Sequence, residues 1–142
     1  DYAHHPTEIK ATLAVAKNYP HNTLWCVFQP HTYTRTKIFL KEFAQALKDA
    51  DQIILTDIYA AREKDLGEIH SRDLLKELEK LGKKAYYFSD FESIENFLLE
   101  NCIPGDLLIT MGAGDVNMIG EELLGTNLST LSTELSTESR IL

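Results

Sequence analysis

The chain has 142 residues and little of what marks several broad classes of protein. Its two cysteines, Cys26 and Cys102, are too few for a disulfide scaffold and fit a reducing compartment, so we expect a cytoplasmic protein. No stretch approaches the ~20 apolar residues of a transmembrane helix, so we expect no membrane partner. Basic residues are also scarce, since 14 Lys and Arg against 22 Asp and Glu give a net charge of −8. This balance argues against nucleic acid as a partner.

Complete catalytic motifs are absent from the sequence as well. There is no Gly-x-x-x-x-Gly-Lys-Ser/Thr phosphate loop, no Cys-x-x-Cys pair and no Gly-x-Ser-x-Gly nucleophile turn. Cys26 falls within an apolar run and Cys102 at a helix end, so neither cysteine is favoured as a nucleophile. By itself, therefore, the chain is not expected to hold a complete catalytic set.

Length and composition fit one folded domain followed by a low-complexity tail. Hydrophobic residues make up 44% of the chain, which is enough for a core at this size. Regular patterns cover residues 1–125, whereas residues 126–142 are rich in Ser and Thr and repeat a Leu-Ser-Thr unit. The first residues are already dense in reactive side chains, so we expect a domain excised from a longer protein.

Short apolar runs alternate with segments of helical periodicity. The expected strands are 24–28, 53–55, 85–88 and 107–111, and the expected helices are 6–19, 34–50, 71–81, 91–98 and 116–123. Runs without polar alternation are typical of strands covered on both faces, which predicts a parallel sheet. The order predicts an open α/β layer fold whose ligands bind beyond the carboxyl ends of the strands.

The sequence also predicts how several helices begin and end. Pro6 suits the first turn of the first helix. Ser71 is the expected cap of the third helix, which Gly82 stops. Ser89 and Glu92 have the spacing of a capping box at the start of the fourth.

The segment after the first expected strand, residues 29–36, gathers a His, an Arg, a Tyr and three hydroxyl groups at a helix start. Helix starts offer free N–H groups to anions, and Arg35 can bind a carboxylate or phosphate through two hydrogen bonds. The alternative is an ordinary helix capped by Thr34 or Thr36, with Arg35 in solvent. Both interpretations remain open at this point.

The other strand ends give weaker signals. Asp57 stands where a ligand-binding residue is expected, but the charged residues 62–68 more often form a solvated loop. Residues 111–115, Met-Gly-Ala-Gly-Asp, favour either a close approach of backbone to ligand or a tight turn. His4 and His5 are adjacent and point to opposite sides of an extended segment, which argues against both binding one metal ion. We expect one of them to face the crevice, and no metal site in this chain.

Four motifs, taken in order, resemble the carboxy-terminal domain of the Mur ligases of peptidoglycan synthesis, and specifically the L-alanine-adding branch. They occupy residues 1–8, 28–36, 57–61 and 111–115. The resemblance covers residues 1–125 and implies a Rossmann-like three-layer α/β unit. It also implies a three-domain, ATP-dependent ligase that joins L-alanine to the lactyl carboxylate of UDP-N-acetylmuramate through an acyl phosphate. ATP and Mg²⁺ would be bound mainly by the central domain, so this chain is expected to be inactive alone.

The resemblance also implies roles for residues near the start of the chain. Asp1 matches the acid that approaches the ATP ribose, so Asp1 and Tyr2 are the expected nucleotide-binding residues. His4 and His5 match the paired histidines at the interface with the missing amino-terminal and central domains. A strand runs directly into Asp1 in the family but is absent here, so the sheet is expected to lack one strand.

Further roles fall on the two strand-end loops. His31 and Arg35 match the loop that reaches the carboxylate end of substrate or product. Asp57, Tyr59 and Glu63 match a loop facing the same cleft, and Tyr59 is expected to contact substrate.

Two positions depart from many members of the family. Thr32 stands where some have a second Arg, and Arg62 stands where many have Gly. The first departure leaves carboxylate capture to Arg35 and His31. The second puts the role of the loop 60–65 in doubt.

Two other functions compete with this interpretation. One is the related ligase that reattaches recycled murein peptides, although the segment 29–36 favours the L-alanine branch. The other is a stand-alone ligand- or metal-binding α/β module built around His4, His5 and His31.

Overall fold

A computed structural model of the chain describes residues 4–112 and 115–124. The helices are α1 (Pro6–Ala16), α2 (Tyr33–Ile38), α3 (Leu40–Leu47), α4 (Ser71–Lys80), α5 (Phe91–Asn101) and α6 (Asn117–Leu124). The strands are β1 (Leu24–Gln29), β2 (Gln52–Leu55), β3 (Ala85–Tyr87) and β4 (Leu107–Gly112). Strands and helices alternate as the sequence predicts, and no described helix is both long and apolar enough to cross a membrane.

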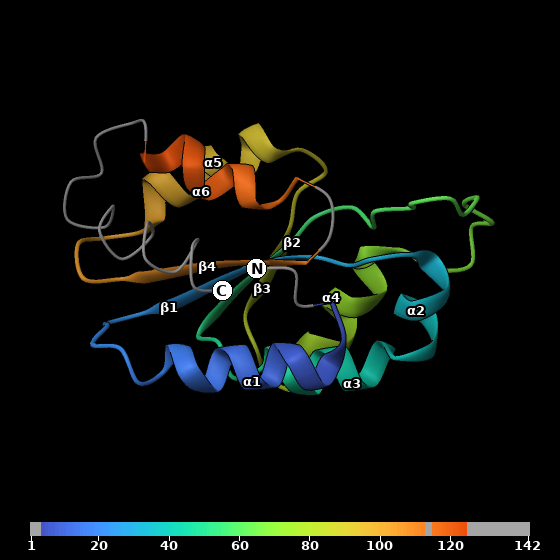
Figure 1. Ribbon diagram of the computed structural model, residues 1–142, viewed down its shortest axis with the longest axis horizontal. Coiled ribbons are helices and arrows are strands. Elements are labelled where there is room, and N and C mark those ends of the chain that lie inside the picture. Colours follow the sequence, from blue (N-terminus) through green and yellow to red (C-terminus); the bar gives the residue numbers. More distant parts are fainter. Residues whose placement is uncertain (1–3, 113–114, 125–142) are drawn as a thin grey trace.

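The four strands form one parallel sheet in the order β3-β2-β1-β4 (Figure 1). Cys26 in β1 pairs with Ile53 on one side and Ile109 on the other. The chain runs from β1 outward to β3 and then returns past β1 to β4, so the strand order reverses beside β1. The predicted open parallel α/β fold is confirmed.

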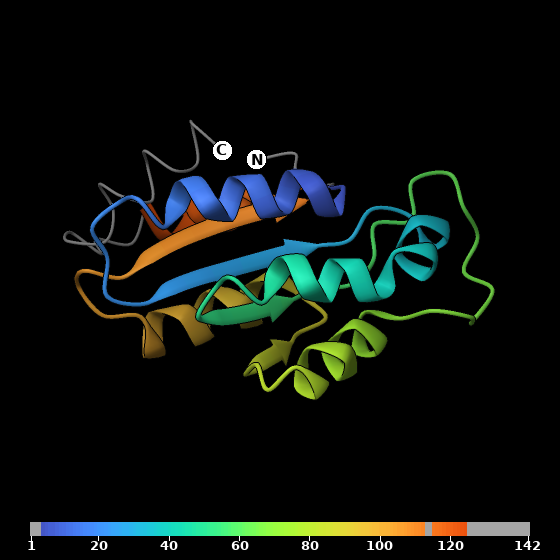
Figure 2. The ribbon, with the colours of Figure 1, turned by 90° about the horizontal axis from the view of Figure 1, so that it is seen from below.

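Helices cover both faces of the sheet, which explains why its strands are apolar on both sides. Alternate residues of β1 enter two different cores: Cys26 and Phe28 pack with α1, α3 and α4, whereas Trp25 and Val27 pack with α5 and α6. Figures 1 and 2 show these two helical layers on opposite sides of the sheet. Consecutive strand residues are therefore buried on opposite faces of the sheet, and this burial supplies the main hydrophobic stabilisation of the fold.

The single helix expected over 34–50 is instead two helices. Phe39 lies between α2 and α3 with φ −105° and ψ 23°, outside helical geometry. Its ring contacts His5 and Phe43, at centroid distances of 5.1 and 6.4 Å. Because Phe39 still fits the apolar periodicity, the sequence pattern continues through the break and the expectation of one helix was wrong.

The start of α4 also differs from the expected cap. His70, and not Ser71, is the N-cap residue, and its Nδ1 accepts the Arg72 N–H at 3.0 Å. The Asp73 carboxylate accepts the His70 N–H at 2.9 Å, which completes a capping box. Ser71 is buried and its hydroxyl donates to Thr56 O at 2.5 Å, so it ties α4 to the end of β2.

At the start of α5 the cap is Asp90. Its carboxylate accepts the N–H of Ser93 at 2.7 Å and the hydroxyl at 3.0 Å. A cap at 89–90 is therefore confirmed, but the capping box expected from Ser89 and Glu92 is not formed, because Asp90 provides the capping carboxylate.

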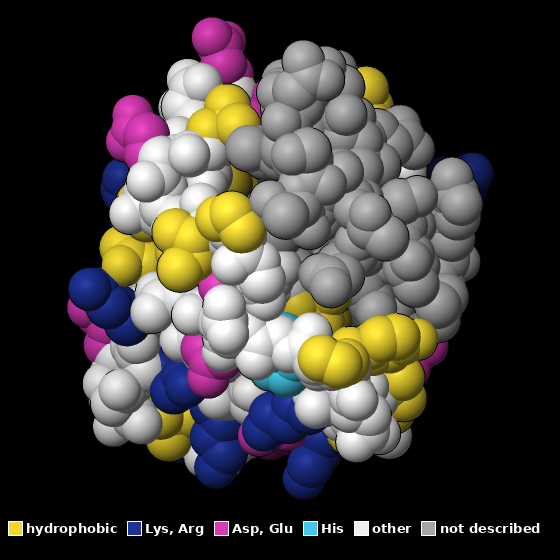
Figure 3. Space-filling view, turned by 90° about the vertical axis from the view of Figure 1, so that its left-hand side faces the viewer, with side chains coloured by type: hydrophobic (Ala, Val, Ile, Leu, Met, Phe, Trp, Pro, Cys, Tyr) yellow, Lys and Arg dark blue, Asp and Glu magenta, His cyan; other side chains and the backbone are white. Residues whose placement is uncertain are grey.

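The end of the sheet where the strands begin is closed by carboxylates that accept N–H groups. Asp106 is 2% exposed and accepts the Thr23 N–H, the Ile103 N–H and the Trp25 indole N–H at 3.0 to 3.1 Å. Asp51 accepts the first amide of β1 at 2.8 Å. Figure 3 views this end and shows acidic and basic side chains interspersed on its surface.

Several expectations fall on residues outside the described ranges. They concern Asp1 and Tyr2 as nucleotide-binding residues, Ala113 and Gly114 of the glycine-containing turn, and the boundary at 125 with its tail 126–142. These expectations stay predictions.

Candidate functional site

His31 and Arg35 form a hydrogen-bonded pair just beyond the carboxyl end of β1. Arg35 Nη1 lies 2.9 Å from His31 Nδ1. Because a guanidinium has only donors, His31 Nδ1 accepts this bond and the neutral ring carries its proton on Nε2. The pair therefore sits beside the strand at which the strand order reverses, where open α/β sheets bind ligands.

Two more rings flank His31. The centroid of the His4 ring is 5.4 Å from that of His31, and the Tyr59 ring stacks on His31 at 6.0 Å. The Thr32 N–H donates to Tyr59 O at 2.8 Å, which holds the β1–α2 and β2–α4 loops side by side. These rings and the Arg35 guanidinium thus lie together. We call this group the His31 cluster: His4, His31, Arg35 and Tyr59. The roles of its members in binding remain predictions.

His5 lies outside the His31 cluster. Its Nδ1 accepts the Thr7 N–H at 3.4 Å as the cap of α1, and its ring packs on Phe39. The two adjacent histidines therefore face different neighbours, as alternation along an extended segment predicts. The arrangement leaves His4 as the histidine that accompanies His31.

The surroundings of His31 favour its neutral form. Burial lowers the pKa of His31 below its ordinary value, and the positive charges of Arg35 and His4 lower it further, while Glu63 opposes them. A neutral imidazole that donates from Nε2, next to a fixed guanidinium, is suited to an anionic oxygen. The cluster can therefore bind a carboxylate and donate hydrogen bonds to it.

The start of α2 is not a free anion site. A side-chain oxygen of Glu63 accepts the N–H groups of Tyr33 and Thr34 at 2.7 and 3.0 Å, so the first two amides of the helix already hold a carboxylate. The hydrogen bonds from Thr34 and Tyr33 keep the pKa of Glu63 below its usual range. Of the two interpretations that the sequence left open, the external anion does not apply to these two amides, because the protein supplies its own carboxylate.

Thr32 is the cap of α2, in place of the expected Thr34 or Thr36. Its hydroxyl accepts the Arg35 N–H at 3.3 Å, and its carbonyl accepts the Thr36 hydroxyl at 2.7 Å. Thr32 has φ +63° and ψ 149°, a conformation that a β-branched residue adopts only when its neighbours hold it there. The residue between His31 and the helix is thus strained.

A second polar cluster joins the carboxyl ends of β2 and β3. The Tyr87 hydroxyl donates to Asp57, and His70 Nε2 lies 3.6 Å from the same carboxylate. The Arg72 guanidinium lies over the Tyr87 ring, 5.0 Å from its centroid. Burial and the hydrogen bond to Asp57 raise the pKa of Tyr87 to about 12. Asp57 is therefore engaged within the protein, and no local pattern in the sequence indicated its partners.

Gly112 allows the close approach of two strand ends at this edge. It has φ +117°, and a Cβ there would lie 2.1 Å from Gln29 O. Gln29 in turn donates through Nε2 to Asp57 O at 3.0 Å. The ends of β4, β1 and β2 are therefore linked, and a side chain at 112 would separate them.

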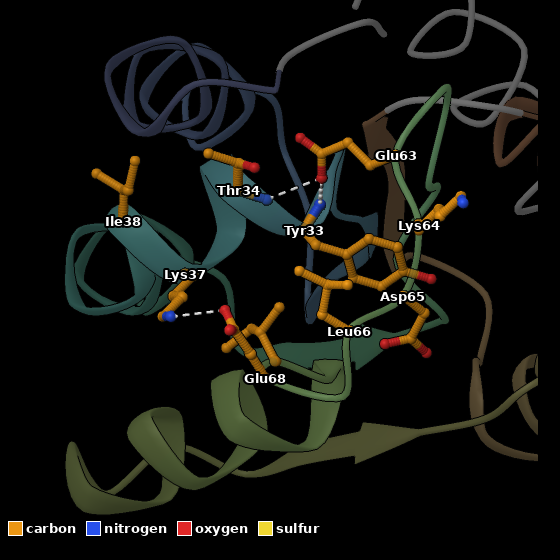
Figure 4. Close-up of a pocket in the computed structure, with 10 residues that line it drawn as sticks. Tyr33, Thr34, Lys37, Ile38, Glu63, Lys64, Asp65, Leu66 and Glu68 are labelled. Atoms are coloured by element: carbon orange, nitrogen blue, oxygen red, sulfur yellow. Dashed lines mark hydrogen bonds and ion pairs between the residues drawn. The ribbon is translucent and has the colours of Figure 1, made fainter.

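A pocket of about 660 Å³ lies between α2 and the loop before α4 (Figure 4). Its apolar wall comes from Ile38, Leu66 and Ile69, and Lys37 and Glu68 form an ion pair of 2.8 Å at its edge. The residues of the His31 cluster do not line it. The pocket shares α2 with the predicted site but does not include the residues of the His31 cluster.

Neither the cysteines nor, in the described part of the chain, a metal centre adds to the site. Burial raises the pKa of Cys26 and raises that of Cys102 to about 12, so both thiols are protonated. Within 4–112 and 115–124, His, Cys, Asp and Glu side chains form no group of three that could hold a metal ion.

Comparison with known proteins identifies the family. The model of the family described as "Mur ligase, glutamate ligase domain" matches residues 1–114. The chain belongs to the Mur ligase family. This Mur ligase chain is 67% identical over 124 residues to the UDP-N-acetylmuramate–L-alanine ligase of Lachnoclostridium phytofermentans, covering 87% of the chain and 26% of that protein. The same enzyme of Acetivibrio thermocellus is 59% identical with the same coverage. The Mur ligase chain thus spans about a quarter of the length of these relatives.

Solved structures of other proteins have the same fold as this Mur ligase chain. A murein peptide ligase from Psychrobacter arcticus matches with a TM-score of 0.69 at 24% identity, over 88% of this chain and 26% of that one. Escherichia coli FolC, solved with ADP, matches with a TM-score of 0.65 at 14% identity, over 91% and 29%. These likenesses confirm the Rossmann-like fold.

Proposed function

We propose that this chain is the carboxy-terminal domain, residues 1–125, of an ATP-dependent ligase that joins L-alanine to the lactyl carboxylate of UDP-N-acetylmuramate. The observation that carries the proposal is the Arg35–His31 pair at the carboxyl end of β1, a cation and a neutral imidazole suited to a carboxylate. The choice of L-alanine and UDP-N-acetylmuramate as substrates rests on the likeness to the L-alanine ligases.

In the proposed reaction the residues of this chain bind and orient. Arg35 binds the carboxylate of L-alanine or of the product, and His31 donates from Nε2 to the same group. Tyr59 and His4, whose rings lie next to that of His31, contact the substrate. Holding the amine in line and excluding water protects an acyl phosphate from hydrolysis.

ATP and Mg²⁺ would be held mainly by a central domain outside this chain, with Asp1 and Tyr2 reaching the nucleotide. When bound, ATP supplies the phosphoryl group that converts the lactyl carboxylate into an acyl phosphate. His5, which caps α1, would face the neighbouring domains through that helix start.

The test is Arg35→Ala in the full-length enzyme. Alanine-dependent ADP formation should fall on the order of 100-fold, because a positioned cation is lost from the site. Arg62→Ala is the matched control, since Arg62 is exposed on the neighbouring loop, and should leave the rate unchanged. The isolated chain should form no ADP. An Arg35→Ala enzyme with the wild-type rate would remove the pair from the mechanism.

The two alternatives differ in their support. The murein-peptide ligase is tested by a competition assay between L-alanine and the tripeptide, in which we expect L-alanine to be used.

For a metal-dependent module, the required histidines do not converge, because His5 packs on Phe39 while His4 faces His31. Calorimetry with Zn²⁺ on this chain should show no stoichiometric binding.

A further inference from the structure

The first turn of α2 depends on a carboxylate from another part of the chain. Glu63 lies on the loop between β2 and α4, 30 residues after Tyr33 and 29 after Thr34, whose amides it binds. Figure 4 shows its side chain turned toward the helix start. The next amide, that of Arg35, is bound by the Thr32 hydroxyl. The first three N–H groups of α2 are thus all held by side chains.

This support matters because α2 cannot hold its own geometry. The helix has six residues, fewer than a helix needs for independent stability. Its cap, Thr32, is strained, and a strained residue persists only where surrounding contacts fix it. His31 and Arg35 stand on either side of Thr32, so any loosening of this turn would change the distance between imidazole and guanidinium.

We propose that Glu63 is a positioning residue of this ligase, which fixes Arg35 within reach of His31 by binding the first two amides of α2. The inference rests on the proposed function of the Arg35–His31 pair and assigns a role to a residue that does not itself touch the substrate. The carboxylate also lies near enough to His31 to affect its charge. It therefore acts on both members of the pair.

The first experiment measures the structure of the chain. In Glu63→Ala, hydrogen exchange of the Tyr33 and Thr34 amides should accelerate on the order of tenfold or more, because they lose their acceptor. In Glu63→Gln, whose amide oxygen can still accept, exchange should stay near wild type. NMR titration of His31 should move to lower pH in both variants, since the negative charge that raises its pKa is gone. Glu68→Ala, on the same loop, should change none of these.

The second experiment measures catalysis in the full-length enzyme. Glu63→Ala should raise the KM for L-alanine on the order of 10- to 100-fold, since small displacements of positioning groups have effects of this size. The KM for ATP should not change, and Glu63→Gln should recover most of the loss. Glu68→Ala is the control, because Glu68 forms an exposed ion pair with Lys37 and should keep the wild-type KM.

The two experiments separate failure of this proposal from failure of the function. Accelerated exchange in Glu63→Ala with a wild-type KM for L-alanine would overturn the positioning role, provided Arg35→Ala is impaired. Wild-type exchange in Glu63→Ala would overturn it as well. If Arg35→Ala itself has the wild-type rate, the proposed function fails whatever Glu63 does.

Discussion

The two ends of the sheet use their charged side chains in opposite ways. Where the strands begin, Asp106 is buried and three N–H groups occupy its carboxylate. Where the strands end, Arg35 and His31 are only half-buried, and the guanidinium keeps N–H groups beyond the one that binds His31. One end is therefore built for stability, and the other leaves hydrogen-bonding capacity for a ligand. Parallel strands make this division possible, because all their carboxyl ends meet at one edge.

The largest effect is expected at the closed end, from Asp106→Ala. The free energy of unfolding should fall by about 3 kcal/mol or more, because one buried and two part-buried N–H donors lose a charged acceptor. Urea unfolding of the chain measures this, with the exposed Glu79→Ala as control, which should stay close to wild type. A loss no larger than that of the control would remove the contrast between the two ends.

A smaller loss is expected at the open end, from Gly112→Ala. The free energy of unfolding should fall by about 2–3 kcal/mol, because the new Cβ meets Gln29 O and the backbone has positive φ. Gly82→Ala is a matched control, since Gly82 has φ +76° with nothing within 4 Å of an added Cβ, and should cost about 1 kcal/mol. Equal losses in the two variants would show that the contact with Gln29 does not matter.

The smallest effect is expected from the titration of His31. Its pKa is lowered in the folded chain, so below pH about 6.5 the unfolded chain takes up the proton first and stability falls. His31→Gln should remove this part of the acid sensitivity. The difference in melting temperature between about pH 8 and about pH 5.5 should therefore be smaller in the variant. A larger difference in His31→Gln would contradict the lowered pKa.

The sequence predicted the fold well, because burial on both faces leaves continuous apolar runs such as 24–28 and 107–111. It failed where a pattern does not distinguish two geometries. Phe39 satisfies the apolar period whether the helix continues or breaks, and here it breaks. His70 caps α4 although the neighbouring Ser71 has the stronger preference for caps, because Ser71 is drawn to the end of β2.

The site was predicted in part for similar reasons. His31 and Arg35 are four residues apart, so their contact follows from the local chain and from the family motif. The contact of Glu63 with α2 joins segments thirty residues apart, and that of Tyr87 with Asp57 does the same. Nothing in local spacing indicates such pairs. A free helix start therefore cannot be predicted from the local sequence when a distant loop supplies the acceptor for its amides.

The contacts of the β2–α4 loop also set where its length can vary. Tyr59 and Glu63 are both hydrogen-bonded to the β1–α2 segment. One residue added or deleted between them would therefore move the Glu63 carboxylate away from the start of α2. Around Gly67 the loop is exposed, and an added residue would only enlarge a turn. Related sequences should accordingly keep a constant spacing from 59 to 63 and accept insertions near 67.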